Sequence, residues 1–267
     1  MSQLTGKTAL ITGSVRGIGF GIAKSLAEKG IRIALHDLQQ DEASEQSCKA
    51  LLKAGAPDVR FFEADMRKPE QIKILMKEVN EWSSIDILVN NAGIQKTGLI
   101  PEIDEAVWND VLAVNLSSSF YTMQAALPIM KQQGYGRVIN IASVHGLVAS
   151  PEKAPYVTAK FGLIGLSKVA ALEYAKASDK NKGGVTINCI CPGWTETELI
   201  EPQILARAAE CGGDREAGIA SMLADKQPSQ RISDPSEIGA LTVWLCDPIA
   251  HNVTGTAIPV DGGWTAQ

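Results

Sequence analysis

The sequence predicts an α/β fold: a doubly wound parallel sheet of about seven strands with helices on both faces. Short apolar runs alternate with longer segments of helical period, and no repeat or low-complexity linker divides them. The run Ile85-Asp86-Ile87-Leu88-Val89 is almost wholly apolar, as is typical of a parallel strand buried on both faces. The 267 residues fit a single α/β unit, so we expect one domain over residues 1–267.

The apolar runs predict strands at Thr8–Thr12, Arg32–Asp37, Val59–Glu63, Ile85–Val89, Gly136–Ala142, Gly184–Cys191 and Thr256–Val260. The helical segments fall near 17–29, 41–54, 69–82, 104–133, 155–177 and 235–246. Residues 194–230 interrupt this alternation with one or two short helices around Gly212 and Gly213. A long insertion at the carboxyl end of a strand lies over the ligand crevice of such a sheet, which favours a mobile substrate lid over a simple surface excursion.

Composition excludes several classes of function. The formal net charge is −5 without a basic stripe, which argues against a nucleic-acid partner. Met1–Lys7 lacks the features of a signal peptide, and no apolar run reaches the length of a membrane span. The five cysteines are scattered and the three histidines are not clustered with other ligands, so we expect reduced thiols and no metal site. These features predict a cytoplasmic protein with no membrane partner.

A glycine-rich turn follows the first predicted strand and precedes the first predicted helix. It reads Thr12-Gly13-Ser14-Val15-Arg16-Gly17-Ile18-Gly19, with the spacing G-x-x-x-G-x-G in place of the common G-x-G-x-x-G. Glycines allow the backbone to approach a pyrophosphate closely, and the helix that follows offers free N–H groups and its positive dipole end. The placement of the turn therefore predicts a Rossmann-type dinucleotide site.

Polar residues at the ends of the next strands extend this site. A carboxylate at Asp37, which ends the second strand, accepts hydrogen bonds from both adenosine ribose hydroxyls and repels a 2′-phosphate, so it favours NAD over NADP. Arg16 argues the other way, because a cation in the glycine turn can meet a 2′-phosphate; we give Asp37 more weight. Asp65 and Asn90-Asn91-Ala92-Gly93 follow the third and fourth strands, where we expect the adenine and its ribose to lie.

Tyr156 and Lys160 are four residues apart on a helix predicted to open with Pro155, so they share one face. The ordinary pKa of tyrosine is about 10, and a nearby ammonium and a positive nicotinamide both favour the phenolate. Tyr156 is therefore predicted to act as a general base. Ser143, just past the fifth strand, is predicted to hold the substrate oxygen. Asn115, within the long helix, is predicted to anchor a water that relays the proton through Lys160.

This conjunction of motifs resembles the short-chain dehydrogenase/reductase family over essentially the whole chain. The resemblance implies a catalytic tetrad of Asn115, Ser143, Tyr156 and Lys160. It implies a homotetramer that pairs the two long helices, at 104–133 and 155–177. It also implies an NAD site made of Gly13, Ser14, Arg16, Gly17, Ile18, Gly19, Asp37, Asp65, Met66, Asn91, Ala92, Gly93, Tyr156, Lys160, Pro192, Gly193, Thr195 and Thr197.

Further segments resemble one branch of that family, the bacterial D-3-hydroxybutyrate dehydrogenases. They lie at residues 90–95, 142–150, 191–194, 226–229 and 260–266. The resemblance implies NAD-dependent, reversible oxidation of (R)-3-hydroxybutyrate to acetoacetate. It implies a substrate site of Gln95, Ser143, His145, Lys153, Tyr156, Trp194, Gln203 and Trp264. These residue types suit a small 3-hydroxy acid, because a cation with neutral donors holds a carboxylate and tryptophans wall a short chain.

Two departures from the family pattern stand out. Residues 176–184 are longer than the usual connection, and Thr195 and Glu196 stand where an apolar residue and a basic one are expected. Glu196 is therefore expected to affect how the lid closes. Two other functions stay open: a dehydrogenase acting on another small alcohol, sugar or hydroxy acid, and a non-catalytic NAD-binding protein. The intact tetrad argues against the latter.

Overall fold

Seven parallel strands form one sheet in the computed structural model, which describes residues 4–177, 183–198 and 200–266. The strands are β1 (Thr8–Ile11), β2 (Arg32–Asp37), β3 (Val59–Glu63), β4 (Ile87–Asn90), β5 (Tyr135–Ile141), β6 (Gly184–Pro192) and β7 (Ala257–Val260). Their order in the sheet is β3-β2-β1-β4-β5-β6-β7. Strands β2 and β3 therefore lie on one side of β1, and β4 to β7 follow one another on its other side. The predicted doubly wound sheet is confirmed. Residues 178–182, within the connection expected to be long, lie outside the described residues.

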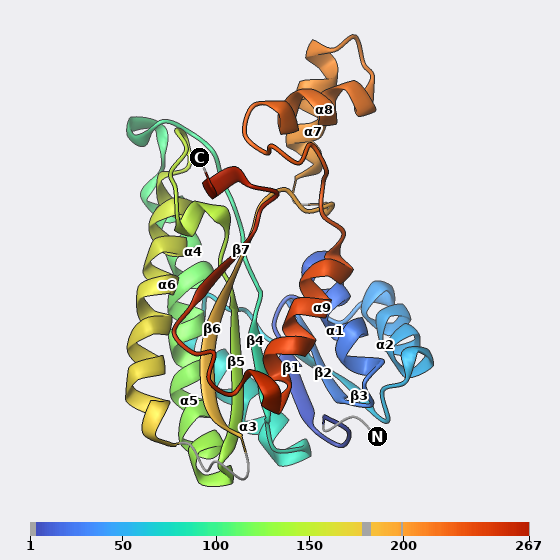
Figure 1. Cartoon of the computed structure of the whole chain (residues 1–267), viewed down its shortest axis with the longest axis vertical. Coiled ribbons are helices and arrows are strands. Elements are labelled where there is room, and N and C mark those ends of the chain that lie inside the picture. Colours follow the sequence, from blue (N-terminus) through green and yellow to red (C-terminus); the bar gives the residue numbers. More distant parts are fainter. Residues whose placement is uncertain (1–3, 178–182, 199, 267) are drawn as a thin grey trace.

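Helices cover both faces of the sheet, with α1, α2 and α9 on one side and α4, α5 and α6 on the other (Figure 1). The helices are α1 (Gly17–Ala27), α2 (Glu42–Ala54), α3 (Pro69–Trp82), α4 (Glu105–Leu112), α5 (Ser118–Gln133), α6 (Ala154–Tyr174), α7 (Glu201–Glu210), α8 (Arg215–Ala224) and α9 (Pro235–Cys246). Single 3₁₀ turns lie at Ile100–Glu102, Val144–Gly146, Ala175–Ala177, Pro248–Ala250 and Trp264–Ala266. No helix in the described part of the chain is long and apolar enough to cross a membrane.

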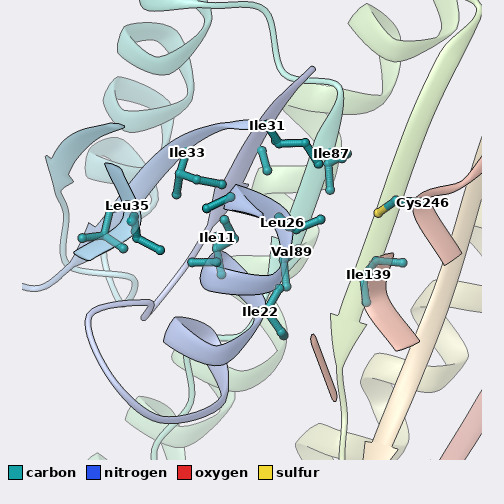
Figure 2. Packing of buried hydrophobic residues seen from close by; sticks show 14 of the residues in the cluster. Ile11, Ile22, Leu26, Ile31, Ile33, Leu35, Ile87, Val89, Ile139 and Cys246 are labelled. Atoms are coloured by element: carbon teal, nitrogen blue, oxygen red, sulfur yellow. The ribbon is translucent and has the colours of Figure 1, made fainter. Parts of the chain in front are cut away.

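Successive side chains of β1 enter opposite cores. Ile11 packs with Ile22 and Leu26 of α1 in the core seen in Figure 2, whereas Leu10 packs in the core on the α3 and α5 side. Each of these side chains is completely buried, which stabilises the fold by about 1.5–3 kcal/mol per residue. Two packed faces hold the sheet rigidly, so the loops at its carboxyl end have fixed starting points.

The prediction of a single helix over 104–133 is wrong in one respect. The chain forms α4 and α5, joined by a π-helical turn over Ala113–Ser117. A π turn inserts an extra residue into a helix and is frequent at functional sites. Periodicity does not reveal it, because the turns on either side remain helical.

The insertion after β6 contains two helices, α7 and α8, with Gly212 and Gly213 in left-handed conformations between them. The pair stands beyond the carboxyl ends of the strands, at the top of Figure 1. It has an apolar cluster of its own: Ile200, Ile204 and Met222, with Trp194, Ile219 and Ile232 packed against them. The expected helices are present, while their movement as a lid stays a prediction.

Candidate active site

A cavity of about 680 Å³ opens at the carboxyl ends of the strands, around the point between β1 and β4 where the strand order reverses. Ser14, Gly19 and Asn115, which were expected at the cofactor or catalytic sites, do not line it. The expected residues that do line it are Gly13, Arg16, Gly17, Ile18, Asp37, Asp65, Met66, Asn91, Ala92, Gly93, Gln95, Ser143, His145, Lys153, Tyr156, Lys160, Pro192, Gly193, Trp194, Thr195, Thr197, Gln203 and Trp264.

The glycine turn after β1 leaves the start of α1 open to a ligand. Gly13 and Gly17 have φ of 60° and 56°, a conformation that favours glycine, and a Cβ at Gly19 would collide with the carbonyl oxygen of Gly13. Ser14 Oγ donates to the carbonyl of Ile11 at 2.7 Å, so its side chain closes the turn from inside. Helix α1 has no side-chain cap and no acid in its first turn, so its N–H groups are available to an anion.

Asn91 fixes the same turn from the end of β4. Its amide nitrogen donates to the carbonyls of Thr12 at 3.0 Å and Gly13 at 2.7 Å. In return, Thr12 Oγ1 accepts from the backbone N–H groups of Asn91 and Ala92, both at 3.0 Å. The Asn-Asn-Ala-Gly segment and the glycine turn therefore form one hydrogen-bonded unit in the cavity wall.

His36, near the end of β2, joins three parts of this wall and was not among the expected site residues. Its Nδ1 accepts from the backbone N–H of Gly13 at 3.1 Å, so its proton lies on Nε2, which is 3.2 Å from the carbonyl oxygen of Ala64. Burial lowers the pKa of His36 to about 4, so the ring is neutral. The available signal was a polar residue interrupting an apolar strand directly before Asp37.

Arg16 and Asp37 face the cavity with different surroundings. The guanidinium of Arg16 lies 2.8 Å from the carboxylate of Glu198, in the segment that leads to α7, and this pairing raises the pKa of Arg16. Asp37 accepts a hydrogen bond from the N–H of Leu38 at 2.8 Å. The cation expected to compete with Asp37 is thus already paired with a carboxylate.

The carboxylate of Asp65, after β3, is bound by Arg67. Arg67 Nε donates to its two oxygens at 2.9 and 3.1 Å, and Nη2 donates at 2.8 Å. These hydrogen bonds lower the pKa of Asp65, which stays ionised. Arg67 also lines the cavity, and sequence reasoning missed it because nothing local distinguishes it from a surface arginine.

Tyr156, Ser143 and Lys160 meet on the chemical side of the cavity. Tyr156 and Ser143 both line the cavity, while Lys160 Nζ lies 5.5 Å from the centre of the Tyr156 ring and donates to the carbonyl of Ile141 at 2.7 Å. Burial raises the pKa of Tyr156, against the direction expected from a neighbouring ammonium, and only the Ser143 side chain opposes it. Burial also lowers the pKa of Lys160 to about 8.

Asn115 reaches this region from the π-helical turn. Its Oδ1 accepts from the N–H of Ile94 at 2.8 Å, and its Nδ2 donates to the Ile94 carbonyl at 2.9 Å. A Cβ at Gly93 would lie in ordinary van der Waals contact with Asn115 Oδ1, at 3.6 Å, and Lys160 Nζ, at 3.9 Å, so both groups lie beside the backbone of Gly93. Asn115 is buried behind the wall, where it positions the segment after β4.

Lys153 lies at the centre of the expected substrate residues. Its Nζ is 3.4 Å from both His145 Nε2 and Gln203 Oε1, and 5.4 Å from the centre of the Trp194 ring. The rings of Trp194 and Trp264 are 5.7 Å apart, and the His145 ring meets Trp264 edge-on at 5.5 Å. The site therefore combines a cation, a neutral amide and an aromatic wall.

The local environment sets the charge of this cluster. Burial, assisted by Lys153, lowers the pKa of His145 to about 4, so the imidazole is neutral. Burial, assisted by Lys226, lowers the pKa of Lys153 to about 8, so the amine remains mostly charged at neutral pH. Trp194 Nε1 and Thr195 Oγ1 are buried and have no hydrogen-bond partner among the described residues. Buried polar atoms without partners are rare, and these two lie in the wall of a ligand cavity.

The two unusual residues after Trp194 connect this wall to the rest of the insertion. Thr195 forms an isolated parallel bridge with Ser233. The carboxylate of Glu196 lies 3.5 Å from the guanidinium of Arg215 on α8, and Arg215 also pairs with Glu201 at 2.9 Å. Glu196 is therefore linked through Arg215 to α8 and, by way of Glu201, to α7.

Comparisons with known proteins agree with this geometry. Residues 13–265 match the family model described as Enoyl-(Acyl carrier protein) reductase. The chain is 43% identical to a D-beta-hydroxybutyrate dehydrogenase of Cupriavidus necator, covering 99% of this chain and 100% of that protein. It is 42% identical to one of Rhizobium meliloti, covering 98% and 99%.

A solved structure shows the same fold. It is a 3-oxoacyl (acyl-carrier-protein) reductase of Agrobacterium tumefaciens with NADP bound, at 26% identity and a TM-score of 0.87, with 98% of this chain and 95% of that chain covered. The glycine turn, the Ser143–Tyr156–Lys160 arrangement and near-complete coverage by the family model lead to one assignment. The chain belongs to the short-chain dehydrogenase/reductase family, whose members are oxidoreductases that use nicotinamide cofactors.

Proposed function

We propose that this protein is an NAD-dependent dehydrogenase that interconverts (R)-3-hydroxybutyrate and acetoacetate. The observation that carries the proposal is the cluster of Lys153, His145 and Gln203 beside two tryptophans, in the same cavity as Tyr156. A lysine ammonium with a neutral amide and imidazole suits one carboxylate, and a wall of two indoles suits a short apolar chain. The names of the relatives from Cupriavidus and Rhizobium support the same substrate.

The residues present fit a dinucleotide cofactor. The uncapped start of α1 suits a pyrophosphate, Asp37 suits ribose hydroxyls, and the unpartnered Thr195 hydroxyl suits the carboxamide of a nicotinamide. Asp37 and the pairing of Arg16 with Glu198 favour NAD over NADP, since a 2′-phosphate would meet an anion and no free guanidinium. Two solved structures that hold NADP are 30% and 26% identical to this chain, too distant for their cofactor to decide the matter.

The proposed reaction divides into two transfers. Nicotinamide, when bound, supplies the hydride acceptor, and its positive charge favours a tyrosinate nearby. Ser143 donates a hydrogen bond to the substrate oxygen while Tyr156 takes the hydroxyl proton; in the reverse direction Tyr156 returns it. Lys160 is proposed to supply positive charge beside Tyr156, and Asn115 to hold the segment after β4 in place.

Carboxylate anchoring also predicts stereochemistry. With the alcohol oxygen held by Ser143 and Tyr156, and the carboxylate held near Lys153, only one enantiomer turns its hydrogen toward the nicotinamide. We therefore expect the (R) acid to be oxidised and the (S) acid to be poor. Trp264→Ala should loosen the apolar wall and admit longer 3-hydroxy acids.

A substrate panel tests the proposal. It contains (R)- and (S)-3-hydroxybutyrate, (R)-1,3-butanediol as a neutral analogue, and a sugar acid such as gluconate, each with NAD and with NADP, scored by absorbance of the reduced cofactor. Fastest turnover of the (R) acid with NAD is the expected result. Faster turnover of a neutral alcohol or sugar would reject the carboxylate site and leave only a dehydrogenase of other specificity, and no turnover at all would favour a binding protein.

We further propose that the protein is a homotetramer assembled through α4, α5 and α6. These helices expose large apolar side chains at Trp108, Phe120, Phe161 and Leu172, of which Leu172 is 79% accessible. Apolar surface of this kind is typical of subunit interfaces. Light scattering of the purified protein tests the assembly, and a monomer would reject it.

A further inference from the structure

Lys226, which follows α8, is close to the substrate cluster without lining the cavity. Its Nζ is 5.4 Å from the centre of the Trp264 ring, the same distance as from Lys153 Nζ to the Trp194 ring. The two indoles are themselves 5.7 Å apart. Two ammonium groups therefore lie near one pair of indoles, and both indoles line the cavity.

Neither ammonium is neutralised by an acid of the described chain. Carboxylate ion pairs among the described residues involve other cations. Lys226 donates to Ser150 Oγ at 2.9 Å, and the partners of Lys153 are the neutral His145 and Gln203. Two uncompensated cations beside a partly buried cavity create a positive potential that attracts anions.

We infer that Lys226 is a positioning residue for the substrate carboxylate, acting on it through the potential it shares with Lys153. The inference rests on the proposed function, because it assigns this residue to the carboxylate end of that substrate. Lys226 is proposed to contact no reacting atom. Its substitution should therefore weaken substrate binding and reduce the preference for acids over neutral alcohols, while the rate of the chemical step stays unchanged.

The same arrangement has a pH signature. The groups that face Lys153 are His145 from the turn after β5, Gln203 from α7, Trp194 after β6 and, through space, Lys226. Lys226 contributes to holding the pKa of Lys153 at about 8, so the free enzyme loses its carboxylate-binding charge as the pH rises past that value. Without the charge of Lys226, the pKa of Lys153 rises and this loss moves to higher pH.

The test compares Lys226→Gln with the wild type and with Lys226→Arg. For Lys226→Gln at pH 7 we expect KM for (R)-3-hydroxybutyrate to rise about two- to fivefold, the scale of a partly screened charge interaction, with kcat nearly unchanged. The alkaline rise in KM should begin at higher pH than in the wild type. Lys226→Arg should restore both values, and Lys49→Gln, an exposed position on α2, controls for net charge.

The outcomes separate the two proposals. If wild type prefers the acid to (R)-1,3-butanediol while Lys226→Gln has unchanged KM and an unchanged pH profile, the role of Lys226 is rejected and the proposed function stands. If wild type uses the neutral diol equally well, the carboxylate site is rejected and Lys226 loses its role with it. Should Lys226→Gln fold poorly by circular dichroism, Lys226→Met keeps an unbranched side chain without the charge and answers the same question.

Discussion

The guanidinium of Arg16 lies 2.8 Å from the carboxylate of Glu198, which joins the glycine turn to the segment entering the α7–α8 pair. Both side chains are more than half exposed, so the ion pair contributes little to global stability. Its position is what matters, because both residues line the cavity beside the glycine turn. It links the place where a pyrophosphate would bind to the part of the chain predicted to move.

Movement of α7 and α8 can be measured by hydrogen exchange. We expect their amides to exchange quickly in the free protein, because their apolar cluster is small and separate from the sheet cores, and more slowly with NAD and acetoacetate bound. Amides of α3, which packs against the sheet, serve as the internal control. Identical protection of α7 and α8 in both states would reject the lid.

Cofactor choice depends on Asp37. Asp37→Ser removes a carboxylate that would face a 2′-phosphate, and we expect the ratio of kcat/KM for NADP to that for NAD to rise about tenfold or more, since like-charge repulsion at an interface costs several kcal/mol. Asp58→Ser, at an exposed loop position before β3, is the matched control. A wild-type enzyme that already prefers NADP would contradict the assignment.

His36 makes stability depend on pH. Its pKa of about 4 in the folded protein is below the ordinary 6.5, so the unfolded chain binds a proton first as the pH falls. The stabilisation is complete above pH 6.5 and is lost as the pH falls toward 4, by about 3 kcal/mol. Urea unfolding at pH 7, 6 and 5 measures it.

His36→Leu is the control for that experiment. It should remove about half of the pH dependence, with the rest left to His145, whose pKa is also about 4, and, by freeing the N–H of Gly13, it should raise KM for NAD. An equally steep dependence in this variant would place the whole titration elsewhere.

Tyr156→Phe removes the proposed proton acceptor and keeps the ring. Turnover should fall by about a hundredfold or more, while NAD binding, followed by tryptophan fluorescence, should persist. Tyr174→Phe, at the other end of α6, tests whether loss of any hydroxyl on that helix has the same effect. Near-normal turnover of Tyr156→Phe would remove it from the mechanism.

Lys153→Ala removes the cation nearest the proposed carboxylate position. The expected loss in kcat/KM for (R)-3-hydroxybutyrate is about 2–5 kcal/mol, because the remaining donors are neutral. Activity with (R)-1,3-butanediol should change far less, and this comparison is the control. Equal losses for the acid and the diol would show that Lys153 supports the fold of the site and does not recognise the carboxylate.

The sequence predicted the sheet well because its signals are local. Continuous apolar runs such as that at Ile85–Val89 mark buried parallel strands, and the glycine turn marks the first strand-to-helix connection. The π-helical turn at Asn115 escaped prediction because one extra residue barely alters the apolar periodicity. Element type was therefore easier to predict than a local change within an element.

The unpredicted parts of the site depend on contacts between distant segments. His36 reaches Gly13 only because β2 pairs with β1, and Arg16 meets Glu198 across 182 positions of sequence. The raised pKa of Tyr156 likewise reflects its burial, which a helical spacing of Tyr and Lys cannot report. Such features follow from the assembled fold and carry no local sequence pattern.

Because of the order of the strands along the chain, the residues of the two halves of the cavity are synthesised at different times. Gly13, His36 and Asn91 lie within or shortly after the first four strands, whereas Trp264 follows β7, the last strand of the sheet. A chain leaving the ribosome can assemble its adenosine-side wall long before it has the indole that completes the substrate wall. NAD binding should therefore appear before turnover when the protein is made by cell-free translation, and following both signals in one translation reaction measures the delay.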